Sequence, residues 1–151
     1  RDVINFVKEV KRRRPDVVFG GDFISGFPTE DESAHKKSID LIKLANITYV
    51  HVFPYSDRDG TPASKMPKVS NVDIKKRAKD LRIVAQTQRQ KFLKSQVGTI
   101  QNVLVEKNSI GYTRNFSKIK LNQIVKCSDI ISTKVLDFNS EGLIGSINEN
   151  S

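Results

Sequence analysis

The sequence is poor in cysteine: Cys127 is the single one among 151 residues. One thiol excludes an internal disulfide and a metal site built from cysteines alone. We therefore expect no metal site in this chain and interpret Cys127 as a small buried hydrophobic residue. Such sparse cysteine is typical of a reducing compartment, and we expect a cytoplasmic location.

Long apolar runs and a glycine-rich phosphate loop are also absent. No stretch of about 18 apolar residues occurs, so we expect no transmembrane helix. No signal peptide is visible, but the chain begins with Arg1 rather than Met, which leaves an upstream segment open. Without the glycine-rich loop, a plain α/β domain for small phosphate ligands is a weak hypothesis.

Positive charge is concentrated in one segment. Residues 1–64 carry ten basic and ten acidic side chains, and residues 95–151 carry six and five. Residues 65–94 carry ten basic side chains and two acidic ones. Localised positive charge indicates a polyanionic partner, nucleic acid first and an anionic membrane second. A solvated, lysine-rich helix face would explain the same composition.

The stretch 22–30 joins a predicted strand to a predicted helix. An apolar strand over 17–24 is followed by Gly26-Phe27-Pro28, which no regular element can contain. Thr29 and Glu32 have capping-box spacing, so we expect the helix to start there. The carboxyl ends of strands in α/β proteins are where ligands bind, although an ordinary turn explains these residues equally well.

Further elements follow in βαβ order. Helical periodicity predicts helices over 2–13 and 30–45, and a second apolar strand covers 47–53. Short joins predict parallel strands with a right-handed crossover. We expect His35 at the surface and interpret His51 as a core histidine without a metal-binding partner.

The second strand ends in a loop over 54–62 that is rich in proline, glycine and polar residues. Two parallel strands would thus end in irregular loops at the same edge of the sheet. This arrangement favours a cofactor pocket there.

A linker over 65–72 leads to a long predicted helix over 72–95. Ser70 and Asp73 again have capping-box spacing. One thin face of this helix is mostly apolar, with Ile74, Ala78, Leu81, Ala85, Gln88 and Phe92. The outer side carries basic residues: Lys75, Lys76, Lys79, Arg82, Arg89, Lys91 and Lys94.

The tail has the pattern of a small closed β-barrel. Five short strands are predicted over 99–105, 110–115, 118–121, 130–138 and 143–147. If the pleat is unbroken, alternate aromatic and cationic residues share one face, namely Tyr112, Arg114, Phe116, Lys118 and Lys120. Such a face stacks bases and holds phosphates. The competing interpretation places Tyr112 and Phe116 in the core and only the charges outside.

Two motifs carry a resemblance to a known family. They are Asp-Phe-Ile-Ser-Gly-Phe-Pro-Thr-Glu over 22–30 and Phe-Pro-Tyr-Ser-Asp-Arg-Asp-Gly-Thr-Pro-Ala over 53–63. In this order they resemble the radical S-adenosylmethionine tRNA methylthiotransferases. His51 to Ser56 is most similar to the branch that acts on threonylcarbamoyladenosine. The tail from Gly98 resembles the family's TRAM-type RNA-binding module.

The resemblance implies a fold and a set of site residues. The fold is the carboxyl-terminal part of a partial (β/α)6, TIM-like barrel (1–64), a basic linker and helix (65–96) and a five-stranded RNA-binding β-barrel (97–151). The implied S-adenosylmethionine contacts are Gly26, Phe27, Pro28, Glu30, Phe53, Tyr55 and Ser56. Arg58 and Thr61 match the same motif without an assigned role. The implied RNA contacts are Lys75, Lys76, Lys79, Arg82 and Arg89 on the helix with Tyr112, Arg114, Phe116, Lys118 and Lys120 on the barrel.

One departure from the family limits the prediction. Its chemistry uses a Cys-x3-Cys-x2-Cys loop for a [4Fe–4S] cluster, and clusters need several thiolates. We therefore expect the carboxyl-terminal portion of an enzyme that adds a methylthio group to C2 of threonylcarbamoyladenosine beside the anticodon. Its partners would be the tRNA anticodon arm and an amino-terminal portion, with no membrane, and it would be inactive alone. The alternative is a non-catalytic RNA-binding remnant.

Overall fold

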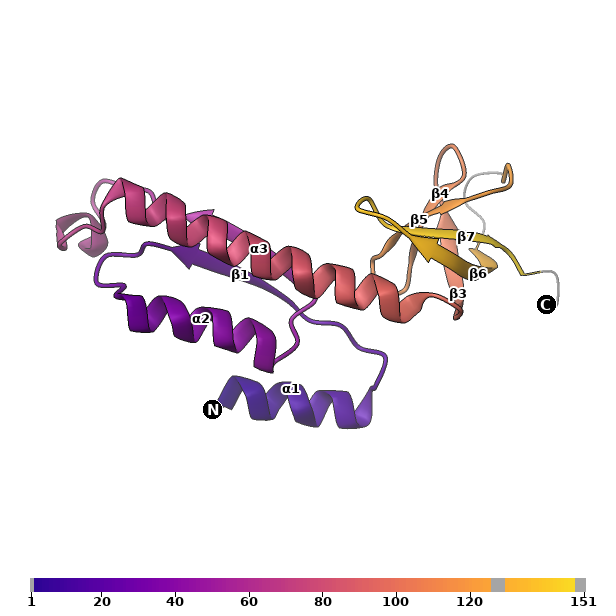
Figure 1. The fold of residues 1–151 in the computed structure, drawn as a ribbon, viewed down its shortest axis with the longest axis horizontal. Helices are drawn as coiled ribbons and strands as arrows, with labels where there is room; N and C mark the ends of the chain where they lie inside the picture. Colours follow the sequence, from indigo (N-terminus) through magenta and orange to yellow (C-terminus); the bar gives the residue numbers. More distant parts are fainter. Residues whose placement is uncertain (1, 126–129, 149–151) are drawn as a thin grey trace. The chain divides into compact units, whose positions relative to one another are not determined.

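A computed structural model describes residues 2–125 and 130–148 (Figure 1). The chain divides into two compact units, residues 1–89 and 90–151. Cys127 lies outside the described residues, so its predicted burial stays a prediction. Within the described ranges, none of the helices combines the length and the apolar character needed to cross a membrane.

The first unit contains a parallel strand pair with helices. Its elements in order are α1 (Asp2–Arg13), β1 (Gly20–Ser25), α2 (Glu32–Leu44) and β2 (Tyr49–Pro54). The predicted parallel pairing is confirmed, with Gly20 opposite Tyr49 and Ser25 opposite Pro54. The predicted start of the first strand is wrong by three residues, because the paired strand β2 begins only at Tyr49 and offers residues 17–19 no ladder partners.

One face of the strand pair packs against helices. The buried cluster there consists of Val7, Ala45 and Ile47, with Phe19, Phe23, Leu41 and Val50 against it. The predicted helix α1 is confirmed, but its apolar side chains are only partly covered. Val7 is buried, whereas Val3 and Phe6 are exposed.

The start of α2 differs from the prediction. Its N-cap is Asp31, whose carboxylate accepts a hydrogen bond from the Ala34 N–H at 2.7 Å. Thr29 is not the cap, because it adopts a left-handed conformation (φ +78°). The Glu30 N–H donates to the Phe27 carbonyl at 2.8 Å, so residues 27–30 form a turn and the helix begins after it. Short polar side chains at the N-cap satisfy such free main-chain donors.

His35 corrects a second prediction. It is buried on α2, and its Nε2 lies 3.6 Å from the Asp80 carboxylate. The expected surface position is therefore wrong, because a helix from later in the chain covers this side of α2.

That covering helix is α3 (Asn71–Gln96), which follows a short 3-10 turn, η1 (Pro62–Lys65). The predicted capping box at its start is confirmed: Ser70 Oγ accepts from the Asp73 N–H at 3.1 Å and donates to the Asp73 carboxylate at 2.7 Å. Gln88 is buried on the predicted inner face. Its side-chain amide donates to the Ile42 carbonyl at 3.1 Å, so α3 packs on α2.

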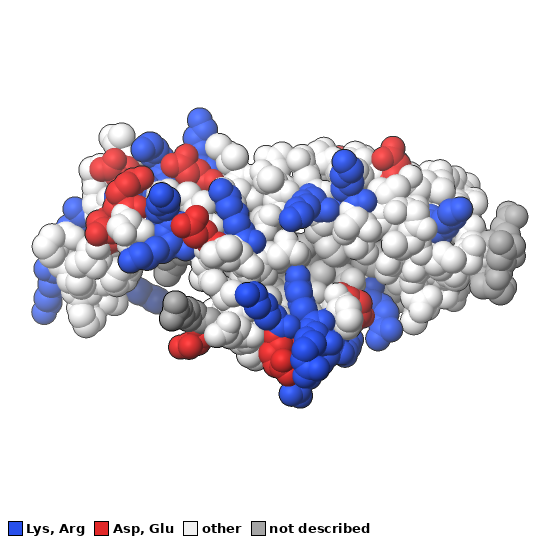
Figure 2. Space-filling model, turned by 60° about the horizontal axis from the view of Figure 1, so that its bottom comes forward, with Lys and Arg blue, Asp and Glu red and all other residues white. Residues whose placement is uncertain are grey.

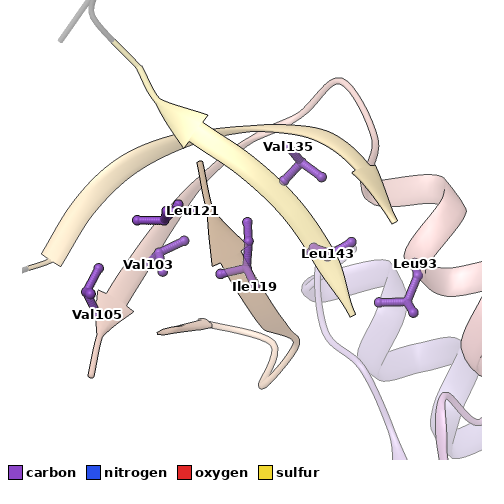
Figure 3. Close-up of a cluster of buried hydrophobic side chains, with 7 residues drawn as sticks. All are labelled: Leu93, Val103, Val105, Ile119, Leu121, Val135 and Leu143. Carbon is purple, nitrogen blue, oxygen red and sulfur yellow. The ribbon is translucent and has the colours of Figure 1, made fainter. Parts of the chain in front are cut away.

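The second unit contains the predicted closed barrel. Its strands are β3 (Ile100–Val105), β4 (Ile110–Thr113), β5 (Lys118–Leu121), β6 (Ile130–Phe138) and β7 (Leu143–Ile147). They close in the order β3-β4-β5-β7-β6, where only β5 and β7 run parallel. The core in Figure 3 consists of Leu93, Val103, Val105, Ile119, Leu121, Val135 and Leu143.

Candidate functional site: two strand-end loops and two surfaces

The two loops predicted to form a pocket wall lie side by side. Residues 26–30 follow β1 and residues 55–61 follow β2, and the parallel register brings both strand ends to one edge. The Tyr55 N–H donates to the Ser25 carbonyl at 2.8 Å, which extends the contact beyond the last strand residues. The expectation that these loops share one edge of the sheet is confirmed.

Gly26 allows the first loop to pass directly beneath α3. It is buried with φ +77°, a conformation that favours glycine. A Cβ added at this position would stand 2.4 Å from Ile74 Cγ1 on α3. The Ser25 hydroxyl donates to the Ile74 carbonyl at 3.2 Å. Gly26 is thus fixed by close packing against a helix as well as by its backbone angles.

The Glu30 carboxylate has partners within the protein. Its Oε1 accepts from the Gly26 N–H at 3.0 Å and from Arg77 Nη1 at 2.9 Å. The same Arg77 nitrogen donates to the Glu30 carbonyl at 2.7 Å. Both side chains are nearly enclosed, with 10% of Glu30 and 11% of Arg77 exposed. Two of the predicted cofactor contacts, Gly26 and Glu30, therefore also have a role in holding the loop together.

Arg77 is a residue that sequence analysis missed. A signal was present: Ile74, Arg77, Ala78 and Leu81 have i, i+3, i+4, i+7 spacing, which places Arg77 on the inner face of α3. The inner face was predicted from its apolar members and Gln88, so Arg77 on the same face was left without a role.

Exposed aromatic rings line the same edge. The rings of Phe27 and Tyr55 meet edge to face, with centroids 5.5 Å apart. Phe27 is 42% exposed and Phe53 is 51% exposed, whereas Pro28 is buried beneath the loop. Ser56 is exposed. Of the seven predicted cofactor residues, Phe27, Phe53 and Ser56 are thus the most exposed, and aromatic rings such as the two phenylalanines stack on other ring systems.

Tyr55 lies next to a polar group formed by Asp57 and Lys68. Burial raises the pKa of Tyr55, and the nearby Asp57 carboxylate adds to the rise. The buried tyrosine hydroxyl makes no hydrogen bond of normal geometry within the described residues. Lys68 hydrogen-bonds Asp57 and holds the pKa of that carboxyl below its usual value. Through Lys68 and Asp57, the linker before α3 is therefore bound to the second loop.

Thr61, which had no assigned role, is a structural residue. Its hydroxyl donates to the Arg58 carbonyl at 2.8 Å and accepts from the Ser64 N–H at 3.3 Å, so it caps η1. The Arg58 side chain is exposed. The Arg58 carbonyl accepts the Thr61 hydroxyl in this turn, and the Arg58 guanidinium lies at the surface.

The uncovered face of the strand pair carries Phe53, a predicted cofactor contact, together with residues that have no predicted site role. Asp22 lies opposite His51, and Ile24 lies opposite Phe53. All four are exposed, whereas the alternate residues face the helices. The interpretation of His51 as a core histidine is therefore wrong. This face presents a polar pair next to an apolar pair, one register step from the loops.

The basic residues of α3 differ in exposure. Lys75, Lys76, Lys79 and Arg82 are exposed, whereas Arg89 is half-buried and has interactions within the protein. On the face that Figure 2 shows, Lys and Arg side chains lie among Asp and Glu side chains over much of the surface. The four exposed members of the predicted RNA contact on α3 therefore describe that contact better than the net charge of the segment does.

The barrel places its predicted RNA residues outside the core but not on one unbroken strand. Phe116 has φ +60° and its N–H donates to the Thr113 carbonyl at 2.9 Å, so a tight turn separates β4 from β5. The assumption of an unbroken pleat is wrong for this reason. Tyr112 is 39% exposed and Phe116 is 78% exposed, so the interpretation of both as core residues is wrong too.

Strand pairing nevertheless aligns part of the set. Tyr112 lies opposite Lys118 across β4 and β5, and opposite Leu104 on β3. Leu104 in turn lies opposite Ile130 on β6. Leu104, Tyr112 and Ile130 are exposed, Lys118 is half-buried, and the cations Arg114 and Lys120 are exposed nearby in sequence. The result is an outward row of apolar and aromatic groups that ends in a lysine.

The residues present do not fit an iron–sulfur cluster. One cysteine in the whole sequence cannot supply the several thiolates that a cluster needs. Across residues 2–125 and 130–148, no group of three or more His, Cys, Asp or Glu side chains is placed to hold a metal ion.

Comparison with known proteins identifies relatives. The threonylcarbamoyladenosine tRNA methylthiotransferase MtaB of Rickettsia prowazekii (strain Madrid E) is 40% identical over 134 residues, which are 89% of this chain and 32% of that protein. The protein of the same name from Aquifex aeolicus (strain VF5) is 37% identical over 121 residues, 79% of this chain and 28% of that protein. No protein-family model matches the chain.

A relative named for a different activity matches a similar part of the chain. The tRNA-2-methylthio-N(6)-dimethylallyladenosine synthase of Roseobacter denitrificans is 29% identical over 147 residues, 93% of this chain and 33% of that protein. The chain therefore spans about a third of the length of the curated relatives it matches.

Proposed function

Because the chain is homologous to the carboxyl-terminal portion of tRNA methylthiotransferases, we propose that it serves as that portion of such an enzyme. The complete enzyme would add a methylthio group to C2 of threonylcarbamoyladenosine next to the anticodon. The observation that carries this proposal is 40% identity over 89% of the chain to a relative named for that activity.

In this proposal the strand-end loops form one wall of an S-adenosylmethionine site. Phe27 and Phe53 would pack against the adenine ring, and Tyr55 would support Phe27 from the side. The bound cofactor supplies the radical chemistry, and this chain's part is to bind and orient it. The cluster ligands would come from an amino-terminal portion, so we expect no methylthiolation by this chain with iron, sulfide and S-adenosylmethionine. Measurable turnover by the isolated chain would contradict the assignment.

The RNA contact is proposed at α3 and at the barrel. Three exposed lysines of α3, Lys75, Lys76 and Lys79, would neutralise backbone phosphates. Tyr112 and Phe116 would stack on unpaired bases, with Arg114, Lys118 and Lys120 beside them. The tRNA anticodon arm supplies both chemistries, because its loop has unpaired bases and its stem has regularly spaced phosphates.

A matched pair of triple variants tests the RNA proposal. Changing Lys75, Lys76 and Lys79 together to Met removes three cations from α3; changing Lys36, Lys37 and Lys43 to Met removes three exposed cations from α2. Binding of an anticodon stem-loop is measured by fluorescence anisotropy over about 50–200 mM salt.

The two variants should behave differently. Each lost phosphate contact should reduce the slope of log K against log salt by roughly 0.7–0.9, so the α3 variant should lose about 2–3 units of slope. The α2 variant should retain the slope of the unmodified chain. Equal losses in both would show that net charge alone attracts the RNA, and binding indifferent to salt would contradict the proposal.

The alternative function is a non-catalytic RNA-binding remnant. It shares the RNA contacts but needs no cofactor site. The coding sequence upstream of Arg1 separates the two proposals: an in-frame Cys-x3-Cys-x2-Cys supports the enzyme, and a start codon without it supports the remnant.

A further inference from the structure

One cation in the basic run of α3 does not face solvent. Lys75, Lys76 and Lys79 are exposed, whereas 11% of the Arg77 side chain is exposed. Its Nη1 lies 2.9 Å from Glu30 Oε1 and 2.7 Å from the Glu30 carbonyl oxygen. Its Nη2 lies 3.8 Å from the exposed Glu32 carboxylate. Arg77 is therefore occupied by the turn between β1 and α2.

The contacts of Arg77 continue into the loop. Glu30 Oε1, which Arg77 neutralises, also accepts the Gly26 N–H at 3.0 Å. One turn of helix away, the Ile74 carbonyl accepts the Ser25 hydroxyl, and the Ile74 side chain leaves no room for a Cβ at Gly26. Both ends of the five-residue loop are thus held by the same two turns of α3.

The charges of Arg77 and Glu30 also depend on each other. A nearly enclosed carboxylate whose cation is removed is left uncompensated, which is costly. Glu30 would then be driven toward solvent, and its bond to the Gly26 N–H would be weakened. The shape of the loop depends on the charge of Arg77 rather than on packing alone.

We infer that Arg77 is a positioning residue for the Gly26–Glu30 loop and takes no part in RNA binding, although it stands among RNA-binding lysines. It holds the loop that presents Phe27 by pairing with Glu30, and so links α3 to the candidate cofactor wall. The inference rests on the proposed function for what the loop and the helix bind.

Hydrogen–deuterium exchange of the 151-residue chain tests the positioning role. In Arg77→Met, the Gly26 amide and its neighbours to Glu30 should exchange on the order of tenfold faster, while amides of β3 are unchanged. Arg77→Lys should stay close to the unmodified chain, because both bonds come from a single nitrogen that an ammonium can replace. Lys91→Met, an exposed cation of the same helix, is the charge-matched control and should have no effect.

A double variant guards against general unfolding. Arg77→Met with Glu30→Gln removes both charges, and the glutamine oxygen can still accept the Gly26 N–H. It should restore most of the lost protection. Unchanged exchange in Arg77→Met would overturn the inference. Equal acceleration in Arg77→Met and the double variant would overturn it as well, since loss of packing would then explain the effect.

RNA binding supplies the second measurement. Arg77→Met should keep the salt slope of the unmodified chain, whereas Lys76→Met should lower it by roughly 0.7–0.9. A lower slope in Arg77→Met would overturn the second half of the inference. If the unmodified chain binds no RNA, the proposed function fails in its RNA part, whereas the exchange experiment still decides the role of Arg77.

Discussion

Replacement of Gly26 by alanine separates two costs that usually occur together. Gly26 has φ +77°, and an added Cβ would lie 2.4 Å from Ile74 Cγ1 and 3.2 Å from Ile74 Cα. The left-handed conformation should cost about 1–2 kcal/mol with alanine. Forcing the loop and α3 apart should add roughly 1–3 kcal/mol. The expected total is about 2–5 kcal/mol.

The chain contains its own control. Gly60 has φ +81°, but an added Cβ would meet nothing within 4 Å. Gly60→Ala should therefore show only the conformational cost, and the difference between the two variants measures the contact with α3. The expected difference is about 1–3 kcal/mol in favour of Gly60→Ala.

Urea unfolding followed by circular dichroism at 222 nm is a suitable assay. Helical signal reports mainly on the first unit, because α1, α2 and most of α3 lie within residues 1–89. The slope of the free energy with urea should not change between variants, so that midpoints compare directly. Losses in the two alanine variants that agree within about 0.5 kcal/mol would refute the close packing of Gly26 against Ile74.

Four further substitutions have predicted outcomes. Asp31→Ala should lower the free energy of unfolding by about 1 kcal/mol, because the N-cap is lost. Thr29→Gly should raise it by roughly as much, because a β-branched residue at positive φ is relieved. Thermal melts measure both variants, and a change of the same sign in both would contradict the placement of the cap. Gln88→Ala should cost about 1–3 kcal/mol in urea unfolding, because it removes a buried donor to α2. Lys68 lowers the pKa of Asp57, so this link is present above the usual carboxyl range and is lost as pH falls through the lowered pKa. In the unmodified chain, proteolysis of the 55–68 loop should become faster in acid. In the Asp57→Asn variant, the loop should be equally sensitive to the protease at all pH values.

Much of the fold could be predicted because its signals are local. The helix over 2–13 and the strands over 118–121, 130–138 and 143–147 match the structure residue for residue. In each, periodicity and the flanking glycine, proline or asparagine residues agree. The capping box at Ser70 was predictable for the same reason, since it depends on residues three apart.

The prediction errors occur where contacts with a segment distant in the sequence determine the position of a residue. His35 looks like a surface residue within α2, and only packing of α3 on α2 buries it. Arg77 looks like one more cation, and only its contact with Glu30 removes it from the surface. The cap of α2 moved to Asp31 because a turn over 27–30 delays the helix. The site loops could be predicted as neighbours from strand order, but the engagement of the Gly26 N–H by Glu30 could not.

The strand order of the barrel has a consequence for the way the chain folds. The hairpin of β4 and β5 joins residues close in sequence, whereas β3 pairs with β6, for example Ile100 with Lys134. β5 also pairs with β7, which follows only after β6 in the chain. The barrel can therefore close only when nearly every residue of this unit is in place.

High contact order of this kind slows folding, because loop entropy is lost before the distant pairings compensate for it. The contacts of α3 with α2 span comparable separations, for example Gln88 with Ile42, but the helices themselves form from hydrogen bonds between residues close in sequence. We expect helices α1, α2 and α3 to form before the barrel closes during refolding. For a short interval the nascent barrel would then consist of β3-β4-β5 and of the β6-β7 pair, with the edges of β3, β5, β6 and β7 exposed until β3 pairs with β6 and β5 with β7.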